Sequence, residues 1–126
     1  MGRRAVDASA AAAVGPYSHG VRARNVVFLS GQTPLDPATG QLVAGDIAKQ
    51  VHQCFANLGA VLKAAGLGFE DVVKANVFLT DMNDFAAMNE VYKTYFTMPY
   101  PARTTIGVAS LPRGAAVEIE MIAEER

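Results

Sequence analysis

Three charged side chains near the C-terminal end have the types and spacing needed to bind a small anion and move a proton. Arg103 directly follows Pro101-Ala102, and proline restricts the backbone that leads into it. Glu118 and Glu120 alternate with apolar residues, so a strand would place both carboxylates on one face. A guanidinium binds a carboxylate through paired hydrogen bonds, and a glutamate can act as an acid or a base. The pattern therefore favours a site for a small carboxylate ligand.

A turn between these two segments would bring them together. Leu111-Pro112-Arg113-Gly114 has the composition of a tight turn, so the flanking runs are predicted to form a hairpin. If Pro112 and Arg113 are its centre, the two glutamates lie opposite Gly107 and Thr105. Arg103 then lies further along the same face.

Each of these residues also has an ordinary structural interpretation. Arg103 could be a surface arginine at a strand edge. Glu118 and Glu120 could be the solvated face of an alternating strand, which is common. In the functional interpretation one glutamate is an ionised general base or one is held neutral as an acid. Spacing does not choose between these two.

Four further residues are candidate ligand contacts, each with a structural alternative. Tyr17 lies in Gly15-Pro16-Tyr17-Ser18, a rigid turn that could aim its phenol into a cleft or leave it half-buried on the surface. Ser30 and Gly31 end a strand, and the glycine permits either close approach to a ligand or a bulge. Asn89 lies beside the apolar stripe of a helix, where it could also cap the helix or face water.

The pattern offers no basis for a metal or cofactor site. Cys54 falls on the apolar side of a predicted helix and is interpreted as a buried core thiol. His19 and His52 have no ligand spacing to a cysteine or to a carboxylate pair, so no metal is expected. A phosphate-binding glycine loop and a serine nucleophile elbow are both missing from the sequence, and no cofactor is expected.

Size and charge limit the classes of protein that fit. The chain has 126 residues and a net charge of −1, and we interpret residues 1–126 as one domain. Apart from Arg3-Arg4 the sequence has no run of basic residues, and this lack of clustered positive charge argues against a nucleic-acid surface. The apolar runs are too short to span a bilayer, and no membrane partner is expected. With a single cysteine, these features predict a soluble, cytoplasmic protein.

Hydrophobic spacing predicts an α+β domain with the order β-β-α-β-α-β-β and both helices on one face of a single sheet. Asp46 is expected to cap the first helix and Gly66 to end it. The strands are expected at 18–21, 26–30 and 72–79 and in the C-terminal hairpin, and the helices at 47–65 and 85–95.

The other face of this sheet is expected to carry both apolar and charged side chains, so we predict self-association. The predicted residues of this face are Phe78, Thr105, Gly107, Glu118, Glu120 and Ile122.

Taken together, these motifs resemble the Rid (YjgF) family of reactive imine deaminases, formerly called perchloric-acid-soluble translation inhibitors. The resemblance covers about residues 14–123. It is carried by the following segments in order: Gly15-Pro16-Tyr17-Ser18, Ser30-Gly31-Gln32, Asn83-Asp84-Phe85, the helix with Asn89, Tyr92 and Phe96, Pro101-Ala102-Arg103 and Glu118-Ile119-Glu120.

The resemblance implies a chorismate-mutase-like fold assembled into a homotrimer, with the sheets forming a central barrel and ligand clefts between subunits. It also implies hydrolysis of 2-iminobutanoate and 2-iminopropanoate to 2-keto acids and ammonia. Such imines arise when pyridoxal-phosphate dehydratases act on threonine or serine. Isoleucine synthesis and general clearance of damaged metabolites are both compatible pathways.

By this resemblance, Arg103 matches the arginine that binds the substrate carboxylate, and Glu118 matches the glutamate that activates water. Tyr17 matches a cleft-lining tyrosine, and Ser30 and Asn89 match polar groups of the site. Thr105 stands where many members carry cysteine, which excludes a thiol nucleophile there and leaves a backbone contact or an altered substrate preference.

Two alternative functions stay open. A non-catalytic binder of 2-keto acids would use the same arginine, and an RNA-directed ribonuclease or translation inhibitor is suggested by older family names. The acidic net charge counts against the RNA-directed role.

Overall fold

The computed structural model describes residues 2–8 and 15–126. Residues 1 and 9–14, including Val14 at the start of the resembling stretch, lie outside the described residues. The elements are β1 (Arg4–Val6), β2 (Gly20–Ala23), β3 (Val26–Gln32), α1 (Ile47–Ala64), β4 (Val72–Leu79), α2 (Phe85–Tyr92), β5 (Ala102–Gly107) and β6 (Val117–Glu124). Three single-turn helices cover Phe69–Asp71, Met82–Asp84 and Pro112–Gly114.

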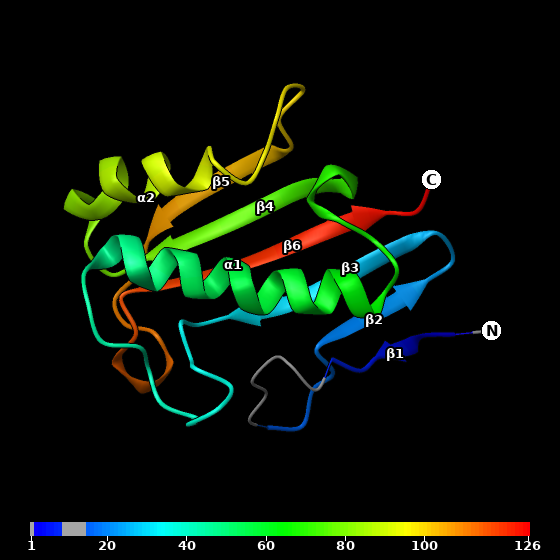
Figure 1. The fold of residues 1–126 in the computed structure, drawn as a ribbon, viewed down its shortest axis with the longest axis horizontal. Helices are drawn as coiled ribbons and strands as arrows, with labels where there is room; N and C mark the ends of the chain where they lie inside the picture. Colours follow the sequence, from blue (N-terminus) through cyan, green and yellow to red (C-terminus); the bar gives the residue numbers. More distant parts are fainter. Residues whose placement is uncertain (1, 9–14) are drawn as a thin grey trace.

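All six of these strands form one sheet in the order β1-β2-β3-β6-β4-β5 (Figure 1). The pairs are antiparallel except β4 and β5, which run parallel. Parallel neighbours need a crossover connection, and α2 lies in the segment that provides it. The α+β prediction is confirmed, and β1 adds a strand that the sequence pattern did not predict.

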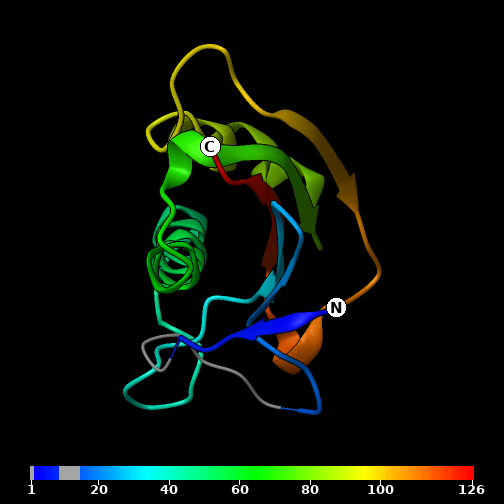
Figure 2. The ribbon, with the colours of Figure 1, turned by 90° about the vertical axis from the view of Figure 1, so that its right-hand side faces the viewer.

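Helix α1 begins and ends where its capping residues predict. The Asp46 carboxylate accepts a hydrogen bond from the backbone N–H of Lys49 at 3.1 Å. Gly66 follows the helix with φ of +77°, a conformation that glycine adopts without steric cost. Figure 2 looks along this helix and shows it packed against one side of the curved sheet.

The core lies between the helices and one face of the sheet. Alternate residues of β4 and β6 are buried there, and Cys54 of α1 is fully buried among them, as predicted. The largest fully buried side chains include Phe55, Leu58, Leu62, Leu79, Met88, Ile119 and Met121. Among the described residues, no helix combines the length and the apolarity required to cross a membrane.

The predicted hairpin between 103–108 and 117–121 is wrong, because β4 lies between β5 and β6. Residues 108–116 cross the end of β4 instead. The N–H of Val108 donates to the carbonyl of Leu79 at 2.8 Å, and the N–H of Thr80 donates to the carbonyl of Ala116 at 3.1 Å. The predicted turn residues lie in this loop, but the loop passes over the end of β4 and connects two strands that are not neighbours in the sheet.

This topology changes which residues share the face opposite the helices, here called the open face. Thr105 is paired with Val77 and Gly107 with Leu79, and both partners are fully buried under the helices. The prediction that Thr105 and Gly107 lie on the open face is therefore wrong. Phe78, Glu118, Glu120 and Ile122 occupy it as predicted, and Phe28 and Ile106 join them.

Candidate functional site

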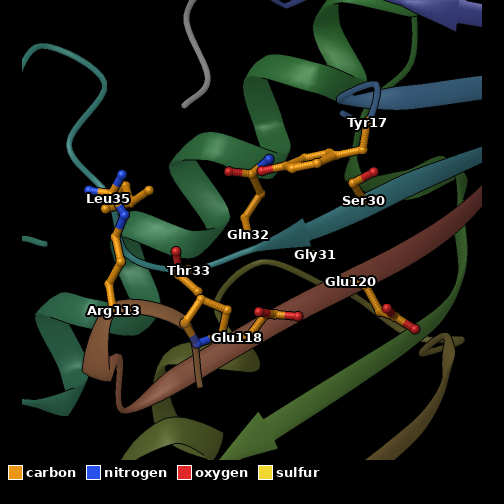
Figure 3. A pocket seen from close by; sticks show the side chains of 10 residues that line it. Tyr17, Ser30, Gly31, Gln32, Thr33, Leu35, Arg113, Glu118 and Glu120 are labelled. Carbon is orange, nitrogen blue, oxygen red and sulfur yellow. The ribbon is translucent and has the colours of Figure 1, made fainter. Parts of the chain in front are cut away.

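A cavity of about 430 Å³ opens beside the ends of β3 and β6 (Figure 3). It brings together Tyr17, Ser30, Gly31 and Glu118, four of the residues singled out from the sequence. The cavity is lined by Tyr17, Ser30, Gly31, Gln32, Thr33, Leu35, Pro112, Arg113, Glu118 and Glu120.

Glu118 is the central ionisable group of this cavity. It lies on β6 between two fully buried neighbours, Val117 and Ile119, and directly opposite Phe78 of β4. Partial burial raises the pKa of its carboxyl above the usual value, and the nearby charge of Glu120 raises that pKa further. A carboxylate with a raised pKa accepts a proton more readily near neutral pH, as a general base must.

Gly31 creates the space that Glu118 occupies. The pairing of β3 with β6 shifts register between Leu29 and Gln32, so the strand bulges at this position. A Cβ atom built on Gly31 would overlap the Glu118 carboxylate and lie 2.9 Å from its Cδ atom. Of the two alternatives left open by the sequence, the structure contains the bulge, and the group that approaches Gly31 closely is the Glu118 side chain.

Ser30 ties the Tyr17 segment to the sheet. Its hydroxyl donates to the carbonyl of Ser18 at 2.6 Å, and its N–H donates to the carbonyl of His19 at 2.9 Å. Tyr17 is 46% exposed, and its ring extends along the cavity towards Gln32 (Figure 3). Ser30 therefore positions the wall of the cavity through its side chain as well as its backbone.

Arg103 belongs to a second group of side chains on the helix side of the sheet. Its Nη1 atom donates to the side-chain oxygen of Asn89 at 2.6 Å. Its guanidinium carbon lies 4.6 Å from the ring centroid of Tyr92 and 5.6 Å from that of Phe85. A hydrogen bond and two aromatic rings therefore hold the cation in one place.

Thr105 shares this face with Arg103, two residues along β5. Its side-chain oxygen is buried and has no hydrogen-bond partner among the described residues. A buried hydroxyl without a partner carries a desolvation cost that a ligand or a neighbouring chain could relieve.

The two groups of predicted residues do not meet within one chain. Arg103 is paired with Ala75, which is buried under the helices, whereas Glu118 faces the other way. The prediction that Arg103 lies on the same face as the glutamates is therefore wrong. Its physical cause is the insertion of β4, which separates β5 from β6.

Two further cavity residues were not proposed from the sequence. Gln32 is 2% exposed, and its side-chain nitrogen has no hydrogen-bond partner among the described residues. Only the bulge reveals that it faces the same way as Ile119. Arg113 adopts a φ of +60° and donates from Nη1 to the carbonyl of Gly40 at 2.9 Å. The only sequence feature that pointed to Arg113 was its place in the predicted turn.

The chain as a whole resembles known proteins in sequence and in fold. The family model described as Endoribonuclease L-PSP matches residues 7–125. The chain belongs to the YjgF/Rid (L-PSP) family. The family resemblance seen in the motifs is thereby confirmed.

Several relatives in this family match the chain over nearly its full length. A mouse protein named 2-iminobutanoate/2-iminopropanoate deaminase is 54% identical over 114 residues, covering 90% of this chain and 84% of the mouse protein. The solved structure of yeast YEO7 has a TM-score of 0.95 and 43% identity, covering 99% of this chain and all of its own. The solved structure of Escherichia coli TdcF with bound serine has a TM-score of 0.91 and 42% identity, covering 98% of this chain and 99% of the TdcF chain.

Proposed function

We propose that this chain hydrolyses 2-imino acids, such as 2-iminobutanoate and 2-iminopropanoate, to 2-keto acids and ammonia without a cofactor. The observation that carries the proposal is the Glu118 carboxylate, partly buried with a raised pKa beside the gap at Gly31. The name of the mouse relative supports the same reaction. We also place the protein in the cytoplasm, where its single buried thiol needs no partner.

The reaction needs a positioned water and one proton-transferring group. Glu118 takes a proton from water as the oxygen attacks the carbon of the protonated C=N bond. The resulting carbinolamine receives that proton on nitrogen and ammonia leaves as the C–N bond breaks. The hydroxyl proton passes to the departing ammonia as the keto group forms. The iminium and water thus become a ketone and an ammonium ion, with no electrons gained or lost. Orientation and acid–base assistance are the contributions required from the protein.

Arg103 is the proposed receptor of the substrate carboxylate. Asn89 orients its Nη1 atom and the Tyr92 ring lies beneath it, so the planar fork is held ready before substrate arrives. TdcF was solved with serine bound, and serine carries the same carboxylate group. Thr105 is proposed to line this part of the site, with its buried hydroxyl available to a ligand.

Because Arg103 and Glu118 lie on opposite faces of one sheet, we propose that two copies of the chain complete each site in a homotrimer. The apolar content of the open face supports assembly. Phe28 and Ile106 are 48% and 45% exposed there. One copy would supply the cavity with Glu118, Tyr17 and Ser30, and a neighbour would supply Arg103 and Asn89.

An RNA-directed activity is the second candidate, because the matching family model is described as an endoribonuclease. The net charge of −1 opposes it, since binding the phosphate backbone requires clustered positive charge. A ribonuclease activity that survives Arg103→Ala would belong to another surface or to a contaminant.

A coupled assay tests the deaminase. A threonine or serine dehydratase generates the imine in a buffer poor in free amines, and the appearance of 2-keto acid is followed with and without this protein. We expect the wild type to accelerate product formation and Glu118→Gln to abolish the acceleration. Glu124→Gln, which removes a charge from the exposed end of the same strand, should behave as wild type. No acceleration by wild type, with 2-ketobutyrate still bound, would make the chain a binder rather than an enzyme.

A further inference from the structure

Asn76 and Glu120 form a polar pair across β4 and β6 on the open face. The two residues are direct neighbours in the antiparallel register. The side-chain nitrogen of Asn76 donates to Oε2 of Glu120 at 2.9 Å. Asn76 thus holds the Glu120 carboxylate in place.

Glu120 is the nearest acidic neighbour of Glu118 along the strand. The two residues are separated by Ile119, project from the same face of β6 and line the same cavity (Figure 3). Two carboxylates in one partly buried site repel each other, so the charge of Glu120 raises the pKa of Glu118.

We propose that Glu120, held by Asn76, is a positioning residue that sets the protonation state of Glu118 during the reaction. The inference rests on the proposed deaminase function and extends it to two residues that the reaction scheme above does not use. Glu118 must accept a proton from water and then return it to the leaving nitrogen. A fixed negative charge beside it strengthens it as a base in the first of these steps.

Four other charged or titratable groups lie around Glu118. Arg113 lines the cavity but donates to the carbonyl of Gly40, and its side chain extends towards Leu35 (Figure 3). Lys74 lies on the open face of β4, and its Nζ atom donates to the hydroxyl of Thr104 at 3.0 Å, on the β5 side. Cys54 lies across the sheet, with a thiol whose pKa is raised by burial and then by Glu118. Tyr17 is the remaining titratable group of the cavity.

The test compares pH–rate profiles of wild type, Glu120→Gln, Asn76→Leu and Glu124→Gln. Glu120→Gln should move the acidic limb of kcat/KM to lower pH, because the charge that retains the proton on Glu118 is gone. Asn76→Leu should move it in the same direction, because the Glu120 carboxylate is no longer held beside Glu118. Glu124→Gln removes an equal charge from the same face of the same strand and should leave the limb where it is.

A titration that does not depend on turnover accompanies the kinetics. Carbon-13 NMR of the Glu118 side-chain carboxyl, assigned by its loss in Glu118→Gln, follows ionisation directly in the folded protein. Its midpoint should fall in Glu120→Gln and Asn76→Leu and stay constant in Glu124→Gln. Unchanged midpoints in the first two variants would overturn the proposal even if the wild type is an active deaminase. Shifted midpoints in a protein without turnover would uphold the Glu120 coupling and reject the deaminase.

Discussion

Arg103 and Glu118 lie on opposite faces of the same sheet, separated by the strand β4. Arg103 is paired with buried Ala75 and its guanidinium lies over the Tyr92 ring, whereas Glu118 is paired with Phe78 on the open face. A small imine bound by one of them therefore cannot contact the other in the same chain. This relationship makes assembly a requirement of the proposed chemistry rather than an accessory to it.

Replacing Arg103 should remove most of the binding of the substrate carboxylate. Truncating one partner of a buried charge pair costs about 2–5 kcal/mol, so Arg103→Ala should lower kcat/KM by about 30-fold to 5,000-fold. Steady-state kinetics in the coupled assay measure this, and calorimetry with 2-ketobutyrate measures the binding part. Arg113→Ala is the matched comparison, because Arg113 lines the cavity of Glu118 in the same chain. Loss with Arg113→Ala and not with Arg103→Ala would reassign the receptor.

The raised pKa of Glu118 makes a prediction about stability. Between its ordinary value of 4.5 and its raised value, the folded chain binds more protons than the unfolded chain at this site. The contribution of Glu118 to the free energy of unfolding therefore falls as pH rises through this window. Glu118→Gln should be more stable than wild type at neutral pH, and the difference should shrink below pH 4.5. Urea unfolding at several pH values, at one protein concentration, measures it. A variant less stable than wild type at neutral pH would contradict the burial argument.

Adding a methyl group at Gly31 should displace the Glu118 carboxylate. The contact involves the end of a flexible side chain, so Gly31→Ala should fold with a loss of stability below about 1–3 kcal/mol. Misplacing the base by about 1 Å should lower kcat by about 100-fold. In a Glu118→Gln background the same change should cause no further loss of activity. Additive losses in the double variant would show that Gly31 acts independently of Glu118.

Asn57 should stabilise the loop that forms the far wall of the cavity. It is 1% exposed, and its side-chain nitrogen donates to the carbonyl of Leu35 at 2.8 Å and to that of Thr33 at 3.4 Å. Asn57→Leu leaves both carbonyls without this donor and should lower the free energy of unfolding by about 1–3 kcal/mol. Gln53→Ala, which removes only a donor to Asn57, should cost less. If urea unfolding shows the same loss of stability in both variants, the loss would come from helix α1 and not from the bonds of Asn57 to the loop.

Local signals in the sequence were sufficient for the elements that position the site. The apolar spacing of α1, its cap at Asp46 and the strand 72–79 each appear in the structure as expected. The second helix ends at Tyr92, before the last apolar position of its stripe. After Tyr92 the chain forms hydrogen bonds between residues three apart, as in a 3₁₀ turn. The N–H groups of Thr94 and Tyr95 donate to the carbonyls of Val91 and Tyr92, respectively.

Long-range pairing was the part that the sequence pattern could not supply. Alternation shows correctly that Glu118 and Glu120 share a face, because this depends on one strand alone. The facing of Arg103 depends on which strand lies beside β5, and a turn composition at Pro112-Arg113-Gly114 does not specify that neighbour. Gln32 was missed for a similar reason, because a bulge reverses the alternation in β3.

Subunit complementation tests the central claim most directly. Arg103→Ala and Glu118→Gln are purified as separate inactive proteins, mixed in equal amounts, unfolded and refolded together, and assayed with the dehydratase. If two copies complete each site, about a quarter of the sites in randomly mixed trimers regain both residues, and activity returns to about a quarter of the wild-type level. Each variant refolded alone should stay inactive. An inactive mixture of correctly assembled trimers, with active refolded wild type beside it, would contradict the shared site.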